Sequence, residues 1–159
     1  MPIQSLQQAI ACQAEVVRFL AKNGIKDLVG GYGELLVSHA LGGVRQNSVN
    51  PGFDIKNREY GRIEVKTRKY ELKEDGSVRK ENRAVGFEGK KNGFDHLAHV
   101  VLNVDFSVVS ACLVSYDQVW PEIERTSGKV GFATSSRLPS SKIITDMLRK
   151  SQSELGYGI

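Results

Sequence analysis

The chain has 159 residues, of which 40% are hydrophobic and 25% charged. This composition is typical of one globular domain, expected here to span residues 1–159. No run approaches the roughly 20 apolar residues of a membrane span, and the N-terminus lacks the pattern of a secretory signal. The two cysteines, Cys12 and Cys112, give neither a disulfide framework nor a zinc-site spacing. We therefore expect a cytoplasmic protein with no membrane partner.

Positive charge is concentrated in one part of the chain. The formal net charge is +4 and the isoelectric point is about 9.1, but residues 56–91 alone contain twelve Lys and Arg against seven Asp and Glu. A local excess of positive charge is typical of a surface that approaches phosphates, so we expect DNA as the partner. A charged hairpin surrounded by solvent is the alternative explanation of this run.

Residues 5–23 are predicted to form the first helix. Ser5 and Gln8 match a capping box, and Gly24 suits the position that follows a helix end. Apolar residues recur at helical spacing, which predicts that one face of this helix packs on the core. The residues at this spacing are Leu6, Ile10, Val17 and Leu20.

A second helix is predicted over about residues 32–41. The glycine-rich residues 30–33 are expected to form a flexible entry to it, and Gly42 and Gly43 end it. Glu34 then lies in the first turn, where the helix dipole also favours a carboxylate. The glycines do not match a phosphate-binding loop, because no Gly-Lys-Ser/Thr sequence follows them.

Residues 62–68 are predicted to form a strand, because charged and apolar residues alternate there. Ile63 and Val65 are expected to face the core. Glu64 and Lys66 would then share the opposite face of the strand.

A shorter strand is predicted just before it, with Phe53 and Ile55 facing inward and Asp54 outward. The segment between the two strands has turn-like chemistry. If the hairpin is centred on Glu59, Asp54 lies directly opposite Glu64, with Cβ atoms roughly 4.5–5.5 Å apart.

Two opposed carboxylates need a compensating charge, since like charges directly across a strand pair are destabilising. Mg²⁺ would remove the repulsion, because it binds through one or two carboxylates and coordinates phosphate with its remaining positions. Lys66, on the same face, would hold a phosphate oxygen or orient an attacking water. The pattern therefore predicts a Mg²⁺ site, with Mn²⁺ as the expected substitute. An exposed hairpin with solvated charges is the alternative.

Asp54, nine intervening residues and then Glu64-Val65-Lys66 resemble the D…(D/E)-x-K signature of the PD-(D/E)xK nucleases, the restriction-endonuclease-like superfamily. Those proteins often carry a further Glu on a preceding helix, where Glu34 stands here. The resemblance implies that Asp54, Glu64 and Glu34 bind the metal and that Lys66 assists the nucleophilic water. These four residues are then the catalytic set.

The resemblance covers about residues 30–70 and departs from the signature at one position, since Pro51 lies three residues before Asp54 instead of directly preceding it. It implies a restriction-endonuclease-like core, a Mg²⁺-dependent DNA endonuclease of restriction or structure-specific type, and a homodimer. Junction resolvases share the pattern and stay open. An alternative from another class is a non-catalytic nucleic-acid-binding module. RNA is disfavoured, because no strand face is rich in the aromatic residues that stack on bases.

A second hairpin is predicted after this strand, since Asp75-Gly76 is a strong signal for a tight turn. It would extend the strand into solvent as a basic two-stranded ribbon, a shape that fits the major groove of DNA. The basic side chains expected to contact DNA are Arg58, Arg62, Arg68, Lys69, Lys73, Arg79 and Lys80.

The remaining elements indicate the fold class. Residues 96–104 and 108–114 are nearly all apolar, as in strands covered on both faces. A loop or short helix is expected over residues 116–124 and a final helix over 142–150. The order of two helices, four strands and a helix favours an α/β domain with a central mixed β-sheet flanked by helices.

Overall fold

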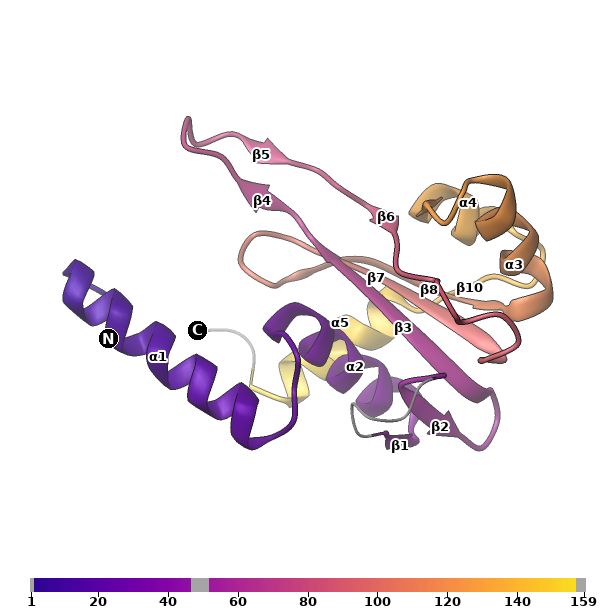
Figure 1. Ribbon diagram of the computed structural model, residues 1–159, viewed down its shortest axis with the longest axis horizontal. Helices are drawn as coiled ribbons and strands as arrows, with labels where there is room; N and C mark the ends of the chain where they lie inside the picture. Colours follow the sequence, from indigo (N-terminus) through magenta and orange to yellow (C-terminus); the bar gives the residue numbers. More distant parts are fainter. Residues whose placement is uncertain (1, 47–51, 157–159) are drawn as a thin grey trace.

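The computed structural model describes residues 2–46 and 52–156, and these form an α/β domain with a six-stranded mixed sheet at its centre (Figure 1). The order of its strands is β1-β2-β3-β7-β8-β10. β3 and β7 are parallel, and the other neighbouring pairs are antiparallel. The strands of this sheet are β1 (Val44–Arg45), β2 (Ile55–Asn57), β3 (Gly61–Lys69), β7 (His96–Leu102), β8 (Val108–Ser115) and β10 (Lys142–Ile143).

Two small antiparallel pairs and the helices surround this sheet. The pairs are β4 (Glu71–Leu72) with β5 (Val78–Arg79), and β6 (Arg83–Ala84) with β9 (Val130–Gly131). The helices are α1 (Leu6–Lys22), α2 (Leu28–Leu41), α3 (Tyr116–Arg125), α4 (Phe132–Arg137) and α5 (Thr145–Glu154). The predicted α/β class with a flanked mixed sheet is therefore confirmed. None of the helices described here is long and apolar enough to cross a bilayer.

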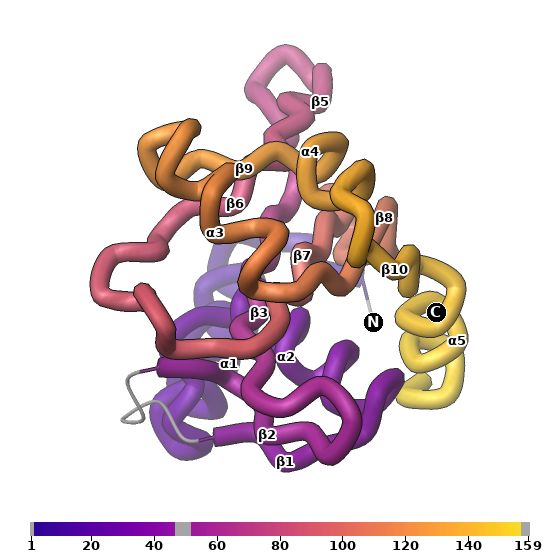
Figure 2. The backbone as a smooth tube through the Cα atoms, turned by 90° about the vertical axis from the view of Figure 1, so that its right-hand side faces the viewer, coloured from indigo at the N-terminus to yellow at the C-terminus, as the bar shows by residue number. Residues whose placement is uncertain are grey.

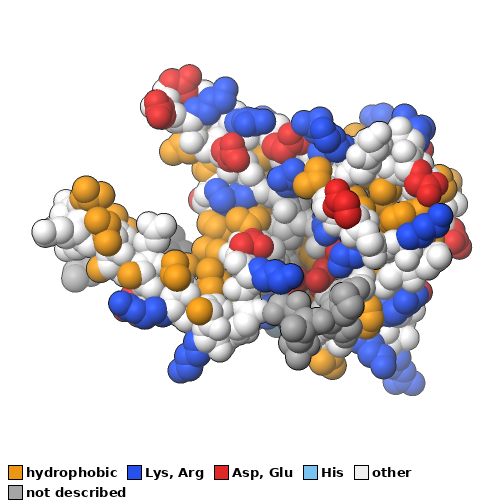
Figure 3. Space-filling model, viewed as in Figure 1, with side chains coloured by type: hydrophobic (Ala, Val, Ile, Leu, Met, Phe, Trp, Pro, Cys, Tyr) orange, Lys and Arg blue, Asp and Glu red, His pale blue; other side chains and the backbone are white. Residues whose placement is uncertain are grey.

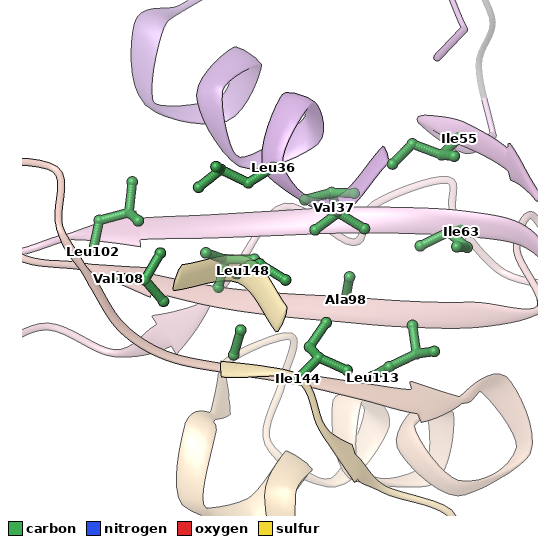
Figure 4. Close-up of a cluster of buried hydrophobic side chains, with 13 residues drawn as sticks. Leu36, Val37, Ile55, Ile63, Ala98, Leu102, Val108, Leu113, Ile144 and Leu148 are labelled. Carbon is green, nitrogen blue, oxygen red and sulfur yellow. The ribbon is translucent and has the colours of Figure 1, made fainter. Parts of the chain in front are cut away.

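The sheet is buried on both faces. α2 and α5 cover one face, where Leu36, Ile63 and Leu148 belong to one apolar cluster (Figure 4). On the other face Phe94 and Val119 belong to a second cluster beneath α3 and α4, and Figure 2 shows these helices across β3 and β7 from α2. The continuous apolar runs that predicted β7 and β8 thus reflect cover on both sides.

Phe53 and Ile55 were expected to share one inward face, and this prediction is wrong. Ile55 is buried in the cluster under α2, whereas Phe53 packs against the second cluster. The reason is that β2 begins only at Ile55, so strict alternation of side chains does not extend back to Phe53.

The first helix forms as predicted, but the predicted packing of one face is wrong. Ser5 caps α1, since its Oγ accepts the N–H of Gln8 at 3.2 Å. No residue of α1 is buried, and the helix projects from the body (Figure 1). Helical spacing shows that a helix is amphipathic and does not show what covers it.

The second helix begins earlier than predicted, so its glycines lie inside the helix and not in a flexible entry. Asp27 caps α2 by accepting the N–H of Gly30 at 2.6 Å. Gly33 faces β3 so closely that an added Cβ would lie 1.8 Å from Oγ1 of Thr67. Glu34 therefore stands in the second turn of α2, not in the first.

We expect Gly33→Ala to lower the free energy of unfolding by about 1–3 kcal/mol, because the new methyl group must displace Thr67 in a packed interface. Gly131→Ala is the control, since its φ is −76° and an added Cβ would meet no atom within 4 Å. Urea unfolding measures both changes. Equal effects of the two substitutions would contradict the close contact between α2 and β3.

Candidate active site

The β2–β3 hairpin places Asp54 opposite Glu64, as predicted. Ile55 pairs with Ile63 and Asn57 with Gly61, so extending the same register by one residue aligns Asp54 with Glu64. The backbone N–H of Asp54 donates to the carbonyl of Ile63 at 2.9 Å, which holds this end of the hairpin.

The turn of this hairpin is fixed by one side chain. Oδ1 of Asn57 accepts the N–H groups of Glu59 and Tyr60, each at 2.8 Å. Its Nδ2 donates to the carbonyls at the end of α2, those of Leu41 at 3.0 Å and Gly42 at 2.7 Å. The register is thus fixed at the turn as well as along the strands, because a slip would break all four bonds.

The Asp54 carboxylate is held by the backbone and surrounded by charge. Its Oδ2 accepts the N–H of Val65 at 2.7 Å. Burial raises the pKa of Asp54 above its ordinary value, and the charge of Glu64 raises it further. The Val65 hydrogen bond and the ammonium groups of Lys90 and Lys66 lower that pKa in part. The surroundings of the Asp54 carboxylate therefore favour the binding of either a proton or a cation.

Glu64 is a buried carboxylate that two lysines neutralise. It is 1% exposed, and its Oε1 lies 2.9 Å from Nζ of Lys66 while its Oε2 lies 3.0 Å from Nζ of Lys90. An unpaired carboxylate at such a depth would be costly, and the two ion pairs offset the cost of burying this one. The alternative of a hairpin with solvated charges is therefore wrong for Glu64.

Glu34 approaches the same group from α2. Its side chain is 25% exposed, and Oε2 lies 3.4 Å from Nη2 of Arg45. Burial, and then the charge of Asp54, raise the pKa of Glu34 to about 7 although Arg45 opposes the shift. Glu64 raises the pKa of Asp54, and Asp54 raises the pKa of Glu34, so these carboxylates form a chain along the site.

A cavity of about 810 Å³ opens beside this chain of carboxylates. Glu34, Arg45, Asp54 and Lys90 line it, together with the C-terminal turn of α1 and the start of α2. Glu64 and Lys66 are not part of its lining. The cavity thus reaches Asp54 and Lys90, and Lys90 lies between it and one oxygen of Glu64.

These residues fit a divalent cation bound through two carboxylates. Asp54, directly before β2, and Glu64, on β3, supply hard oxygen ligands, which is the set that Mg²⁺ takes when it keeps several waters. Among residues 2–46 and 52–156, no cluster of three or more His, Cys, Asp or Glu side chains is arranged to hold a metal ion. A direct role for Glu34 as a third ligand therefore stays a prediction, whereas the effect of the Asp54 charge on the pKa of Glu34 follows from the geometry.

The residues predicted to contact DNA divide into two groups. Lys73, Arg79 and Lys80 are exposed on the β4–β5 ribbon, which forms as predicted, and Arg58 is exposed in the β2–β3 turn. Arg79 has a weak contact with Glu71 at 3.7 Å. These side chains can meet a phosphate backbone without breaking a buried contact.

The other three side chains are already engaged in the fold. Arg62 donates to Asp95 at 2.9 and 3.1 Å. Nε of Arg68 donates to the carbonyl of Arg83 at 2.7 Å, and Lys69 lies over the ring of Phe106, 5.3 Å from its centroid. Because side chains alternate along β3, Lys69 points away from the face that carries Glu64 and Lys66.

The sequence did not predict the ion pair between Lys90 and Glu64. Lys90 lies in the loop between β6 and β7, where its N–H donates to Phe87 at 3.1 Å and its carbonyl accepts from Gly93 at 2.9 Å. No spacing connects it to Glu64, because a folded loop makes this contact across 26 residues. The only signal in the sequence was its place in the basic segment.

Comparison of the chain with known protein families found no matching family, and comparison with curated proteins found no match. The residues and their geometry therefore carry the functional interpretation.

The pH dependence of stability tests the placement of Glu34. Its pKa of about 7 in the folded protein exceeds the ordinary value of 4.5, so folding takes up a proton between these values. Stability without metal should be greatest below about pH 4.5 for this group and fall as the pH rises through 7, by on the order of 3 kcal/mol at most. Glu34→Gln should remove this part of the pH dependence.

Urea unfolding in EDTA between pH 5 and 8 measures the effect, with roughly one pH unit between points, since a single group titrates over about two units. Glu59→Gln, an exposed residue of the β2–β3 turn, is the control and should keep the parent's pH profile. An unchanged profile in Glu34→Gln would place Glu34 in solvent.

Proposed function

We propose that this protein is a Mg²⁺-dependent DNA endonuclease with a restriction-endonuclease-like core, of restriction or structure-specific type. The observation that carries the proposal is that Asp54, directly before β2, faces Glu64 on β3, with Lys66 paired to Glu64 and Glu34 beside Asp54. A non-catalytic nucleic-acid-binding module has no need of two opposed carboxylates, one buried and the other lining a cavity.

Asp54 and Glu64 would hold the cation between adjacent strands. The Val65 N–H fixes the orientation of the Asp54 carboxylate, and the strand itself fixes that of Glu64. Mg²⁺ bound there would act as a Lewis acid on the phosphate and lower the pKa of a bound water. Glu34 has a pKa of about 7. Its carboxylate would accept a hydrogen bond from a water near the cation, or take up a proton from that water.

When the cation binds Glu64, Lys66 and Lys90 would be released from this carboxylate and could bind the substrate. A divalent cation brings the positive charge that Lys66 and Lys90 supply to Glu64 in the metal-free fold. Lys66, held on β3, would then orient the attacking water or bind a non-bridging phosphate oxygen. In the hydrolysis the water oxygen bonds to phosphorus, one bridging P–O bond breaks, and the leaving oxygen takes up a proton.

The β4–β5 ribbon supports DNA as the substrate. It continues the strand that carries Glu64 and Lys66, so Leu72 lies roughly 20 Å along the chain from Lys66 at the usual strand rise. All residues from 71 to 80 are exposed. Residues 71–80 have no net charge, because Lys73, Arg79 and Lys80 are matched by three acidic residues. A two-stranded ribbon of this shape can enter a major groove, where these basic side chains can meet phosphates while the cavity meets the backbone further along.

The ribbon gives the first test of this proposal. Arg79→Ala/Lys80→Ala should weaken DNA binding and reduce the slope of log affinity against log salt by up to about 0.9 for each lost phosphate contact. Lys129→Ala/Lys150→Ala removes the same charge from exposed positions elsewhere and should leave the slope unchanged. Fluorescence anisotropy in EDTA over a range of salt concentrations measures both. An unchanged slope in the ribbon variant would place the DNA on another surface.

Asp54→Asn separates chemistry from binding. Asn can still accept the Val65 N–H, and the repulsion with Glu64 disappears, so the metal-free variant should be as stable as the parent or slightly more stable. Cleavage should fall by roughly 10²-fold or more, because a metal ligand is lost. Lys66→Ala should lose cleavage to a similar extent while still binding the metal.

Nicking of supercoiled plasmid and of branched DNA in Mg²⁺ or Mn²⁺ measures cleavage, with Tm values in EDTA as the measure of stability. Asp146→Asn makes the same change at a side chain that is 97% exposed and should cut as the parent does. Cutting of branched DNA alone would favour the resolvase alternative. Tight binding without any cutting by the parent would favour the non-catalytic module.

A further inference from the structure

α1 is a helix without tertiary cover. It has 17 residues, none of them buried, and its large apolar side chains are exposed except that of Leu20, which is half-buried. These side chains are Leu6 (76% exposed), Ile10 (58%), Val16 (38%), Val17 (58%) and Phe19 (59%). Figure 1 shows the helix projecting from the body, and Figure 3 shows apolar side chains along it. An isolated helix of this length is marginal in water, so a partner must stabilise it.

The apolar residues of α1 follow a seven-residue repeat. Ile10 and Val17 occupy the first position of the repeat and Leu6 and Leu20 the fourth, with Gln13 at the intervening fourth position. The run contains fewer than three repeats, so spacing alone does not predict a coiled coil. The exposure of Leu6, Ile10 and Val17 is the independent observation that adds to the pattern, whereas Leu20 is half-buried beside the cavity.

The charged residues of α1 leave this seam free. Glu15, Arg18 and Lys22 fall within an arc of about 60° on the opposite side of the helix, at 100° per residue. Two identical seams can therefore meet without like charges between them. Arg18 is paired with Glu15, so α1 also lacks the row of free basic side chains that a nucleic acid would require.

The composition of the seam favours a second copy of this helix over another partner. β-branched residues at the first position and Leu at the fourth favour two parallel strands in a coiled coil. α2 and α5 bury most of their apolar residues against the sheet. Leu28 and Leu35 of α2 are exposed, but they line the cavity at the C-terminal end of α1 and leave Leu6, Ile10 and Val17 uncovered. A self-complementary seam with this composition is what a two-fold symmetric pair needs.

We propose that α1 forms a parallel two-stranded coiled coil with α1 of a second copy and thereby makes the protein a homodimer. Phe19 and Leu20, at the end of this helix, also line the cavity beside Glu34 and Asp54. Pairing through α1 therefore brings the second copy to the rim of the candidate site. The association needs neither metal nor DNA, so its failure would leave the proposed chemistry untouched.

Sedimentation velocity in EDTA, without DNA and across a wide range of concentrations, tests the proposal. The parent should sediment with twice the mass of the chain. Ile10→Gln/Val17→Gln should weaken association by roughly tenfold or more, because it buries two amides in the seam. Leu72→Gln/Val78→Gln makes similar changes at exposed apolar positions of the ribbon and should leave the dimer intact. Circular dichroism should show a folded body in each variant.

A cysteine reporter tests the pairing itself. In a Cys12→Ser background the only other cysteine, Cys112, is buried. Leu6→Cys should then form a disulfide-linked dimer under mild oxidation, since parallel pairing brings identical seam positions within bonding distance. Gln8→Cys, on the outer face, should not. A monomeric parent, a dimer insensitive to Ile10→Gln/Val17→Gln, or a dimer without the Leu6→Cys crosslink would each overturn the proposal.

Discussion

The candidate site depends on how the fold keeps two carboxylates together. Asp54 and Glu64 lie opposite each other across β2 and β3, and Glu64 is almost completely buried. Without partners, an ionised carboxylate at this depth would cost several kcal/mol. Lys66 and Lys90 supply one ammonium group to each oxygen of Glu64, and the Val65 N–H supports Asp54. The metal-free site is thus near charge balance, and a cation can enter only if a lysine gives up its place.

β3 and α2 hold the residues of the candidate site in place. β3 lies between β2 and β7, so the residues of the site stand on a strand that is paired on both sides. The contact of Gly33 with Thr67 lets α2 lie close to β3, and this closeness brings Glu34 to Asp54. Lys90 comes from a long loop, and Asp54 from the bend directly before β2. Groups held on rigid elements keep their geometry, whereas a loop residue can move when its partner changes.

The sequence was enough to predict what depends on local pattern. The alternation along β3 and a turn centred on Glu59 predicted the register that aligns Asp54 with Glu64, and Asp75-Gly76 predicted the ribbon. The contact of Lys90 with Glu64 could not be predicted, because it depends on the path of a long loop. The glycines of α2 suggested flexibility, since the approach of Thr67 that requires Gly33 is visible only in the fold. The seam of α1 was recognised, but the pattern does not identify the surface that covers it.

The most direct test of the central claim is anomalous diffraction from crystals that contain Mn²⁺. The opposed carboxylates predict one strong anomalous peak between Asp54 and Glu64, with the ammonium group of Lys90 withdrawn from Oε2 of Glu64. At saturating Mn²⁺, a structure with no peak there and with both Lys66 and Lys90 still on Glu64 would contradict the account, because the buried carboxylate would then serve the fold alone.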